Sequence, residues 1–181
     1  MLLEDQVAPK RCGHFDGKQV IPTEEMLSKL SVALDTRHDS DFVIIARTDA
    51  RAVEGLDSAI ERANRYGELG ADMCFVEAPQ SRTELERVTR EVPFPQLANM
   101  LPGGVTPILP ASELQELGFR IVVDPVGPLL ATGHVMRRLA QAMLQEGRVD
   151  QLSSEMLTFA EVKKLLGLDE INTLLRDQLW D

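Results

Sequence analysis

The sequence predicts an α/β fold built from βα units around a parallel sheet, and two observations support this prediction. From residue 20 onward, short apolar runs alternate with amphipathic stretches, which is typical of strands connected by helices. The apolar runs are nearly continuous, as expected for parallel strands that are covered on both faces. This periodicity fits an open doubly wound sheet and a (β/α) barrel equally well, and it does not distinguish between them.

The predicted elements follow one another in a regular order along the chain. Apolar runs predict strands at 42–46, 73–76, 96–98 and 120–123. Amphipathic periodicity and helix start signals predict helices at 23–37, 56–69, 82–91, 111–117 and 128–146. Gly70 and Gly118 end two of these helices just before the next strand. After a polar link at 145–154, the tail 158–180 predicts one or two further short helices.

Composition and charge limit the classes of partner. The chain has 181 residues, 44% of them hydrophobic, which suits one soluble globular domain. Its 29 acidic side chains outnumber 19 lysines and arginines, so the net charge of −10 would repel a nucleic-acid backbone and anionic lipid. We therefore expect no nucleic acid and no membrane among its partners. The chain shows neither a membrane-length apolar run nor a secretory leader, and we expect a cytoplasmic protein.

Polar side chains stand at the ends of several predicted strands. Arg47, Glu77 and Asn99 each follow an apolar run, and Glu4 lies near the start of the chain. In both candidate architectures, ligands bind at the carboxyl ends of the strands. We therefore expect these four residues, which differ in charge, to converge on one face and form a site.

Two cysteines lie in very different surroundings. Cys12 belongs to a loop with two acids, two bases and an imidazole, and its neighbours Lys10 and Arg11 favour a thiolate that can exchange a proton. The alternative is an inert surface cysteine, because charged loops are normally just solvated. Cys74 lies inside an apolar run and is interpreted as a small buried hydrophobe. Two free thiols fit a reducing compartment.

Two further features have alternative interpretations. The guanidinium of Arg47 could clamp a carboxylate with two parallel hydrogen bonds, or it could form an ion pair with Asp49 or Glu77. Asn99 is followed by a permissive turn that contains Gly103 and Gly104. That turn could present backbone N–H groups to an anion, or it could be a simple loop.

Taken together, these segments resemble the isocitrate lyase and phosphoenolpyruvate mutase superfamily. Within it, they are most similar to the branch of 2-methylisocitrate lyase, dimethylmalate lyase and oxaloacetate hydrolase. The resemblance covers about residues 2–166. It rests on Leu3-Glu4-Asp5-Gln6, Lys10-Arg11-Cys12-Gly13-His14, Ile45-Ala46-Arg47-Thr48-Asp49-Ala50, Phe75-Val76-Glu77-Ala78, Ala98-Asn99-Met100, and Gly103-Gly104 with Thr106-Pro107.

The resemblance implies a Mg²⁺-dependent carbon–carbon lyase on a (β/α)₈ barrel with extra C-terminal helices. The implied reaction cleaves a small 2-hydroxy di- or tricarboxylate through an enolate-like intermediate, in which Mg²⁺ and fixed donors stabilise the developing charge. The alternatives are a carboxyphosphonoenolpyruvate phosphonomutase, an oxaloacetate hydrolase or decarboxylase, and an inactive paralogue or non-catalytic subunit. The thiol at Cys12 favours carbon–carbon cleavage over phosphoryl migration.

The resemblance also implies a role for each site residue. Cys12 matches a catalytic cysteine on a mobile loop that exchanges a proton with the substrate carbon. Glu4 matches an acid of the metal shell. The positions that match substrate-binding residues are Gly13, His14, Arg47, Glu77 and Asn99.

The start of the chain departs from the family pattern. The first three βα units of the family, with the acidic pair that anchors Mg²⁺, have no counterpart in these 181 residues, and such a barrel needs at least ~200. We therefore expect the C-terminal part of a barrel, about strands four to eight, at 1–150 and a helical tail at 151–181. Pro102 replaces a common acid, which leaves the substrate open. The apolar tail predicts a homo-oligomer.

Overall fold

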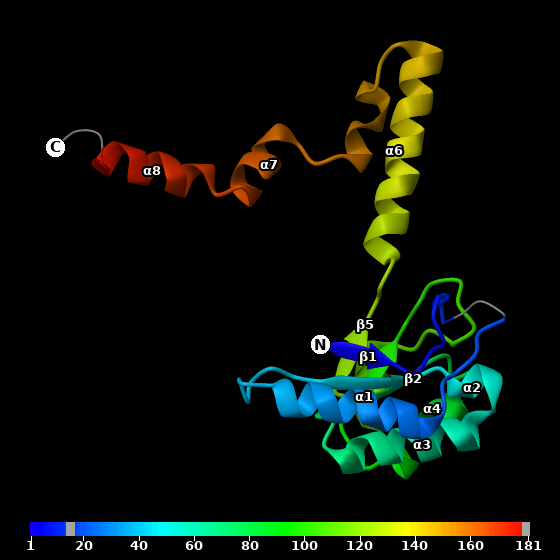
Figure 1. The fold of residues 1–181 in the computed structure, drawn as a ribbon. Helices are drawn as coiled ribbons and strands as arrows, with labels where there is room; N and C mark the ends of the chain where they lie inside the picture. The colour runs from blue at the N-terminus through cyan, green and yellow to red at the C-terminus, as the bar shows by residue number, and fades with distance from the viewer. Residues whose placement is uncertain (14–16, 179–181) are drawn as a thin grey trace. The chain divides into compact units, whose positions relative to one another are not determined.

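The structure is a computed structural model that describes residues 1–13 and 17–178, and Figure 1 shows its fold. Contacts within the chain divide it into two compact units, Met1–Gly127 and Pro128–Asp181. Within the described residues, the first unit holds all of the strands, and the second is helical. The domain boundary expected at residue 150 stays a prediction.

The strands of the first unit run parallel and follow chain order. β1 pairs with β2 and β2 with β3, while β4 pairs with β5. A parallel bridge between Cys74 and Gln96 joins the two groups. The predicted parallel, sequential order is therefore confirmed, and the carboxyl ends of the strands point the same way. The strands are β1 (Leu2–Glu4), β2 (Ile45–Thr48), β3 (Met73–Val76), β4 (Leu97–Asn99) and β5 (Ile121–Val123).

Helices connect these strands, and α1, α3 and α4 lie on one side of β1 and β2 in Figure 1. The helix α3 packs on β2 and β3. Its buried side chains recur every three or four positions, which places them on one stripe of the helix. The helices of this unit are α1 (Thr23–Thr36), α2 (Ala50–Val53), α3 (Leu56–Leu69), α4 (Arg82–Glu91) and α5 (Ala111–Leu117).

The core of this unit lies between the sheet and its helices. All four residues of β3 are buried, and Cys74 and Val76 pack with Ala59 and Ala63 of α3. The helix approaches its neighbours closely at Gly67, where an added Cβ would lie 2.3 Å from the ring of Phe94. Burial of these apolar side chains stabilises the sheet that carries the site.

Sequence periodicity located most elements, but the strand predicted at 42–46 was misplaced. The observed strand β2 begins at Ile45 and includes Arg47. The reason lies in strand pairing, because the register of β1 starts where Leu2 meets Ile45. Phe42 and Val43 precede this pairing and remain 48% and 46% exposed. An apolar run therefore extends beyond the strand that it predicts.

A second difference concerns the strand predicted at 120–123, which was expected to be buried on both faces. Ile121 and Val122 of β5 are 37% and 39% exposed. Among the described residues, β5 pairs only with β4 and stands at the edge of the sheet. Its apolar sequence therefore marks a surface that the described chain leaves partly uncovered.

The second unit consists of helices. They are α6 (Gly127–Glu146), the 3₁₀ helix η1 (Asp150–Glu155), α7 (Phe159–Leu165) and α8 (Leu168–Gln178). One or two short helices were predicted after the polar link, and the structure has two, α7 and α8, although Trp180 lies outside the described residues. Ala142 and Leu152 are buried, whereas many other apolar side chains of this unit are exposed. No helix in the described ranges has the length and hydropathy to cross a membrane.

Candidate active site

A cavity of about 320 Å³ opens at the carboxyl ends of β2, β3 and β4. Two of the predicted residues reach it from the loop after β1, and three come from the strand ends. The structure therefore brings five of the seven predicted site residues together, namely Cys12, Gly13, Arg47, Glu77 and Asn99. Glu4 lies beside this cavity, and His14 lies outside the described residues.

Arg47 is the charged centre of the cavity. Its Nε and Nη2 donate to the two carboxylate oxygens of Asp49 at 2.8 and 3.0 Å, and its Nη1 lies 3.2 Å from Oε2 of Glu77. The guanidinium also stands 5.1 Å from the ring centre of Phe75. The ion pairs considered as one alternative therefore form, with both acids at once. Burial opposes the charge, but these carboxylates raise the pKa of Arg47 above its ordinary value.

Glu77 is almost completely buried, with 1% of its surface exposed. Burial raises the pKa of its carboxyl above the ordinary value, and the positive charge of Arg47 opposes that shift. The amide Nδ2 of Asn99 donates to its Oε1 at 3.4 Å. Ala78, the next residue, has a φ of 59°, an uncommon backbone conformation for a residue with a Cβ. A constrained turn therefore aims Glu77 into the cavity.

Gly13 covers the Arg47–Glu77 pair from the loop, and Cys12 lines the same cavity next to it. Cys12 is exposed, whereas Gly13 is buried. A Cβ added to Gly13 would lie 2.5 Å from Nη2 of Arg47 and 2.5 Å from Cδ of Glu77. Only a residue without a side chain allows the loop to approach the ion pair so closely.

Glu4 is the predicted metal ligand, and its surroundings show whether the described residues fit a magnesium ion. Its carboxylate oxygens lie 3.6 Å from Nζ of Lys10 and 3.4 Å from Nε of Arg47, so two cations flank it. Mg²⁺ requires near-octahedral oxygen coordination. No group of three or more His, Cys, Asp or Glu side chains that could hold a metal occurs among residues 1–13 and 17–178. These residues therefore do not form a magnesium site by themselves.

Two acids behind the cavity were not among the predicted site residues. Asp49 orients Arg47, and its own backbone N–H donates to the fully buried Asp5 at 2.9 Å. Asp5 also accepts from the hydroxyl of Tyr66 at 2.9 Å and lies 3.3 Å from Nη1 of Arg62. The signal was available, because both acids stand in the motifs that carry the resemblance.

Cys74 lies apart from this chemistry, as predicted. It is fully buried, and its Sγ lies 3.3 Å from the carbonyl oxygen of Ala63. Burial raises the pKa of its thiol to about 12, so the thiol stays protonated. The structural interpretation of Cys74 is confirmed.

The chain is similar to proteins of one enzyme family. The family model for phosphoenolpyruvate phosphomutase matches residues 1–144. A 2,3-dimethylmalate lyase from Eubacterium barkeri is 41% identical over 169 residues, covering 93% of this chain and 58% of the relative. A 2-methylisocitrate lyase from Shewanella oneidensis is 40% identical over 178 residues, covering 98% and 61%. A chloroplastic carboxyvinyl-carboxyphosphonate phosphorylmutase from Arabidopsis thaliana is 42% identical over 170 residues, covering 92% and 50%.

Solved structures agree with these relatives. A crystal structure of 2,3-dimethylmalate lyase aligns with a TM-score of 0.86 and 31% identity, covering 97% of this chain and 59% of that one. Oxaloacetate acetylhydrolase in complex with 3,3-difluorooxalacetate aligns with a TM-score of 0.88 and 30% identity, covering 97% and 60%. A phosphonopyruvate hydrolase complex with oxalate and Mg²⁺ has a TM-score of 0.80 and 23% identity, covering 98% and 62%, and shows the fold alone. The chain thus spans between half and two thirds of the proteins it matches.

Proposed function

The chain belongs to the phosphoenolpyruvate phosphomutase family, and from this premise we propose that it acts as a carbon–carbon lyase on a small 2-hydroxy di- or tricarboxylate. One observation carries the proposal: Cys12 shares a cavity with Arg47, Glu77 and Asn99. A thiol, a guanidinium, a buried carboxyl and an amide provide a proton donor, an anion clamp and polar contacts for a hydroxy acid.

We assign Arg47 to the carboxylate of the substrate. A guanidinium has five N–H donors, and the hydrogen bonds to Asp49 use one on Nε and one on Nη2, while Nη1 lies 3.2 Å from the Glu77 carboxylate as an ion pair. The remaining donors on the Nη atoms can bind the carboxylate of the substrate. Gly13 has no side chain to block them. Asp49 holds the guanidinium in place, which reduces the entropy lost on binding.

The proton steps of the proposed cleavage use two further residues. The substrate hydroxyl loses its proton to Glu77, whose raised pKa makes it a stronger base than an ordinary carboxylate. The hydroxyl carbon becomes a carbonyl as the carbon–carbon bond breaks, and the electron pair of that bond stays on the departing acid as an enolate-like species. The thiol of Cys12 donates a proton to this carbon and becomes a thiolate.

Magnesium dependence also remains a proposal. A bound Mg²⁺ would supply Lewis-acid stabilisation of the enolate, and Glu4 would provide one carboxylate ligand. The described residues do not complete such a site, so the steps above involve only groups of the chain itself. Isothermal titration of the protein with MgCl₂, with Glu4→Gln as comparison, tests the ligand assignment.

Binding of a small dicarboxylate tests the anion clamp without requiring turnover. We expect oxalate to bind the wild-type protein, and Arg47→Gln to weaken its affinity at least about 10-fold, because one charge-assisted contact is lost. The control is Arg137→Gln, which removes an exposed arginine of α6. Isothermal titration gives the dissociation constants. Equal affinity in the wild type and Arg47→Gln would contradict the clamp.

Turnover tests the role of the thiol. We expect any release of a 2-oxo acid from 2-methylisocitrate or 2,3-dimethylmalate to be abolished by Cys12→Ser, because serine is a far weaker acid than cysteine. A coupled assay of the oxo-acid product measures the rate. A variant that keeps the wild-type rate would show that Cys12 is not the proton donor.

A second candidate is the phosphorylmutase reaction, because a relative with that name is 42% identical. That reaction moves a phosphoryl group and has no carbanion for Cys12 to protonate. Phosphorus NMR of the protein with a phosphonate substrate distinguishes the two candidates. A phosphoryl shift that survives Cys12→Ser would favour this second candidate over the lyase.

Location and assembly complete the proposal. We propose a cytoplasmic protein, because its two free cysteines suit a reducing compartment. We also propose a homo-oligomer, supported by exposed apolar side chains such as Leu144 and Phe159 in the second unit. A small carboxylate is the expected partner, and nucleic acid and membranes are not.

A further inference from the structure

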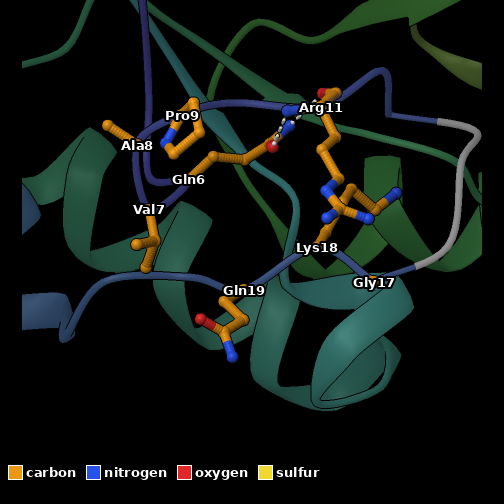
Figure 2. A pocket seen from close by; sticks show the side chains of 8 residues that line it. All are labelled: Gln6, Val7, Ala8, Pro9, Arg11, Gly17, Lys18 and Gln19. Atoms are coloured by element: carbon orange, nitrogen blue, oxygen red, sulfur yellow. Dashed lines mark hydrogen bonds between the residues drawn. The ribbon is translucent and has the colours of Figure 1, made fainter.

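The backbone on either side of Cys12 is held by two side chains that the proposed chemistry does not use. Arg11, before Cys12, is bound by Gln6, and Gly13, after it, is bound by Lys18. Figure 2 shows Gln6, Arg11 and Lys18 around a small pocket next to the loop. The thiol itself is exposed. The side chain of Cys12 is thus exposed, while the backbone before and after Cys12 is held by hydrogen bonds.

Gln6 binds Arg11 through both ends of its amide. Its Nε2 donates to the carbonyl oxygen of Arg11 at 2.9 Å, and its Oε1 accepts from the N–H of Arg11 at 2.9 Å. The dashed lines in Figure 2 mark this paired contact. Gln6 is 7% exposed, so water competes little for its amide. Both backbone groups of the residue before the thiol are therefore satisfied by one side chain.

Lys18 binds the other side of Cys12. Its ammonium donates to the carbonyl oxygen of Gly13, and Nζ lies 3.9 Å from Oδ1 of the fully buried Asp49. Only 3% of the Lys18 side chain is exposed. A buried ammonium is costly unless it is paired and hydrogen-bonded, so Lys18 favours the loop position that supplies both partners. Asp49 also holds Arg47, through two hydrogen bonds of its own that do not involve Lys18.

We propose that Gln6 and Lys18 are positioning residues that hold Cys12 at the mouth of the cavity. The catalytic meaning of this inference rests on the proposed lyase function, whereas the fixing of the loop does not. Neither residue touches the reacting atoms. Each acts through the backbone next to Cys12, so the thiol reaches the carbanion only while both contacts are made. Removing either contact releases the loop without removing the thiol or the clamp.

Tryptic cleavage after Arg11 tests the fixing of the loop. The variants are Gln6→Met, which keeps the length of the side chain, and Lys18→Met, which shortens it by one atom, and both remove the hydrogen bonds. We expect cleavage to be about 10-fold faster or more in each, since a hydrogen bond to a charged or buried group contributes on that scale. Gln115→Met and Lys164→Met, on exposed positions of α5 and α7, are the matched controls. Labelling of buried Cys74 by iodoacetamide reports unfolding in the same sample.

Protection of Cys12 from alkylation by bound oxalate tests whether Gln6 and Lys18 hold the thiol over the substrate cavity. In the wild type, saturating oxalate should slow alkylation of Cys12 about 10-fold, because the thiol stands over the occupied cavity. In Gln6→Met and Lys18→Met the protection should fall toward none, while the oxalate dissociation constant changes less than about 3-fold. Gln6→Glu and Lys18→Arg each keep part of the hydrogen bonding and should restore part of the protection. A change in side-chain volume alone would not make protection depend on how many hydrogen bonds the substituted side chain keeps.

The outcomes separate the two proposals. Unchanged cleavage after Arg11 in both methionine variants, with Cys74 unlabelled, would overturn the fixing of the loop. If cleavage is faster in the methionine variants but the wild type does not bind oxalate, the fixing of the loop is supported and the proposed function is contradicted. Retained protection in loosened variants would show that the position of Cys12 does not depend on these side chains, which also overturns the inference. If Cys74 becomes labelled in a methionine variant, that variant is unfolded. Cleavage and oxalate protection are then measured in Gln6→Glu or Lys18→Arg instead.

Discussion

Single residues at the cavity show how much a pattern of residue types can predict. Arg47, Glu77 and Asn99 could be identified from their places after apolar runs, and the structure brings them together. The roles of Gln6 and Lys18 could not, because they come from contacts with the backbone of the loop. A polar residue in a loop gives no signal that it will be 3% exposed and paired, as Lys18 is.

Gly13 leaves no room for a side chain next to the Arg47–Glu77 pair. A Cβ at this position would lie 2.5 Å from both Arg47 and Glu77, so Gly13→Ala should push the loop off the ion pair. We expect the free energy of unfolding to fall by about 1–3 kcal/mol, as for other overpacked sites. Gly133→Ala is the control, because nothing lies within 4 Å and alanine favours α6 by about 0.5–1 kcal/mol. Urea unfolding measures both, and a stabilised Gly13→Ala would contradict the steric argument.

Glu77 provides a prediction about pH. Burial raises its pKa in the folded chain above the ordinary value of 4.5. Between these two pKa values the folded state binds more protons than the unfolded state, so the contribution of Glu77 to stability decreases as pH rises from about 4.5 through the raised pKa. We expect Glu77→Gln to remove this slope. Urea unfolding of both proteins at several pH values above 4.5 measures it, and parallel curves would show that Glu77 does not titrate in this range.

At the scale of elements, helices were predicted more accurately than strands. The helices predicted at 56–69, 82–91 and 111–117 have the observed bounds of α3, α4 and α5. A helix satisfies its hydrogen bonds locally, so its own sequence largely fixes where it begins and ends. The bounds of a strand depend on the strand that pairs with it. The pairing of β1 with β2 starts at Ile45, which explains why β2 starts three residues after the predicted position. The short α2 was not predicted, because four residues carry no periodicity.

Tyr66 tests the link between elements behind the cavity. Its hydroxyl, on α3, donates to Asp5 after β1, and Asp5 accepts from the backbone of Asp49 after β2. Burial raises the pKa of Tyr66, so the hydroxyl remains a donor at neutral pH. We expect Tyr66→Phe to reduce the free energy of unfolding by about 1.5–3 kcal/mol, since a hydrogen bond to a buried charge is lost. Urea unfolding measures the change, and a loss below about 0.5 kcal/mol would show that Arg62 and the N–H of Asp49 satisfy Asp5 without the hydroxyl.

At the scale of the whole molecule, the resemblance predicted what periodicity could not. Alternating apolar and amphipathic segments left two architectures open, and the motifs around Cys12, Arg47 and Glu77 identified the family to which the chain belongs. The partner of the apolar surfaces could not be predicted in the same way. Exposure is a property of the folded chain, and β5 looked like a buried strand in the sequence.

The exposed apolar residues of the second unit predict that the chain associates with copies of itself. Leu144 is 87% exposed and Phe159 is 78% exposed, more than expected for large apolar side chains of a protein that functions alone. We expect light scattering after size exclusion to show an oligomer. Leu144→Glu and Phe159→Glu should shift it toward the monomer, because a charge cannot be buried there without a partner. The control is Gln141→Glu, at an exposed position of α6, which adds the same charge and should leave the oligomer unchanged.

Salt separates an apolar interface from a charged one in this experiment. The chain carries a net charge of −10, so two copies repel one another, and salt screens that repulsion. Association through apolar side chains should therefore become stronger between about 0.05 and 0.5 M NaCl, whereas association through ion pairs should become weaker. An oligomer that dissociates in high salt, or one that Leu144→Glu and Phe159→Glu leave intact, would place the contact on a different surface of the chain.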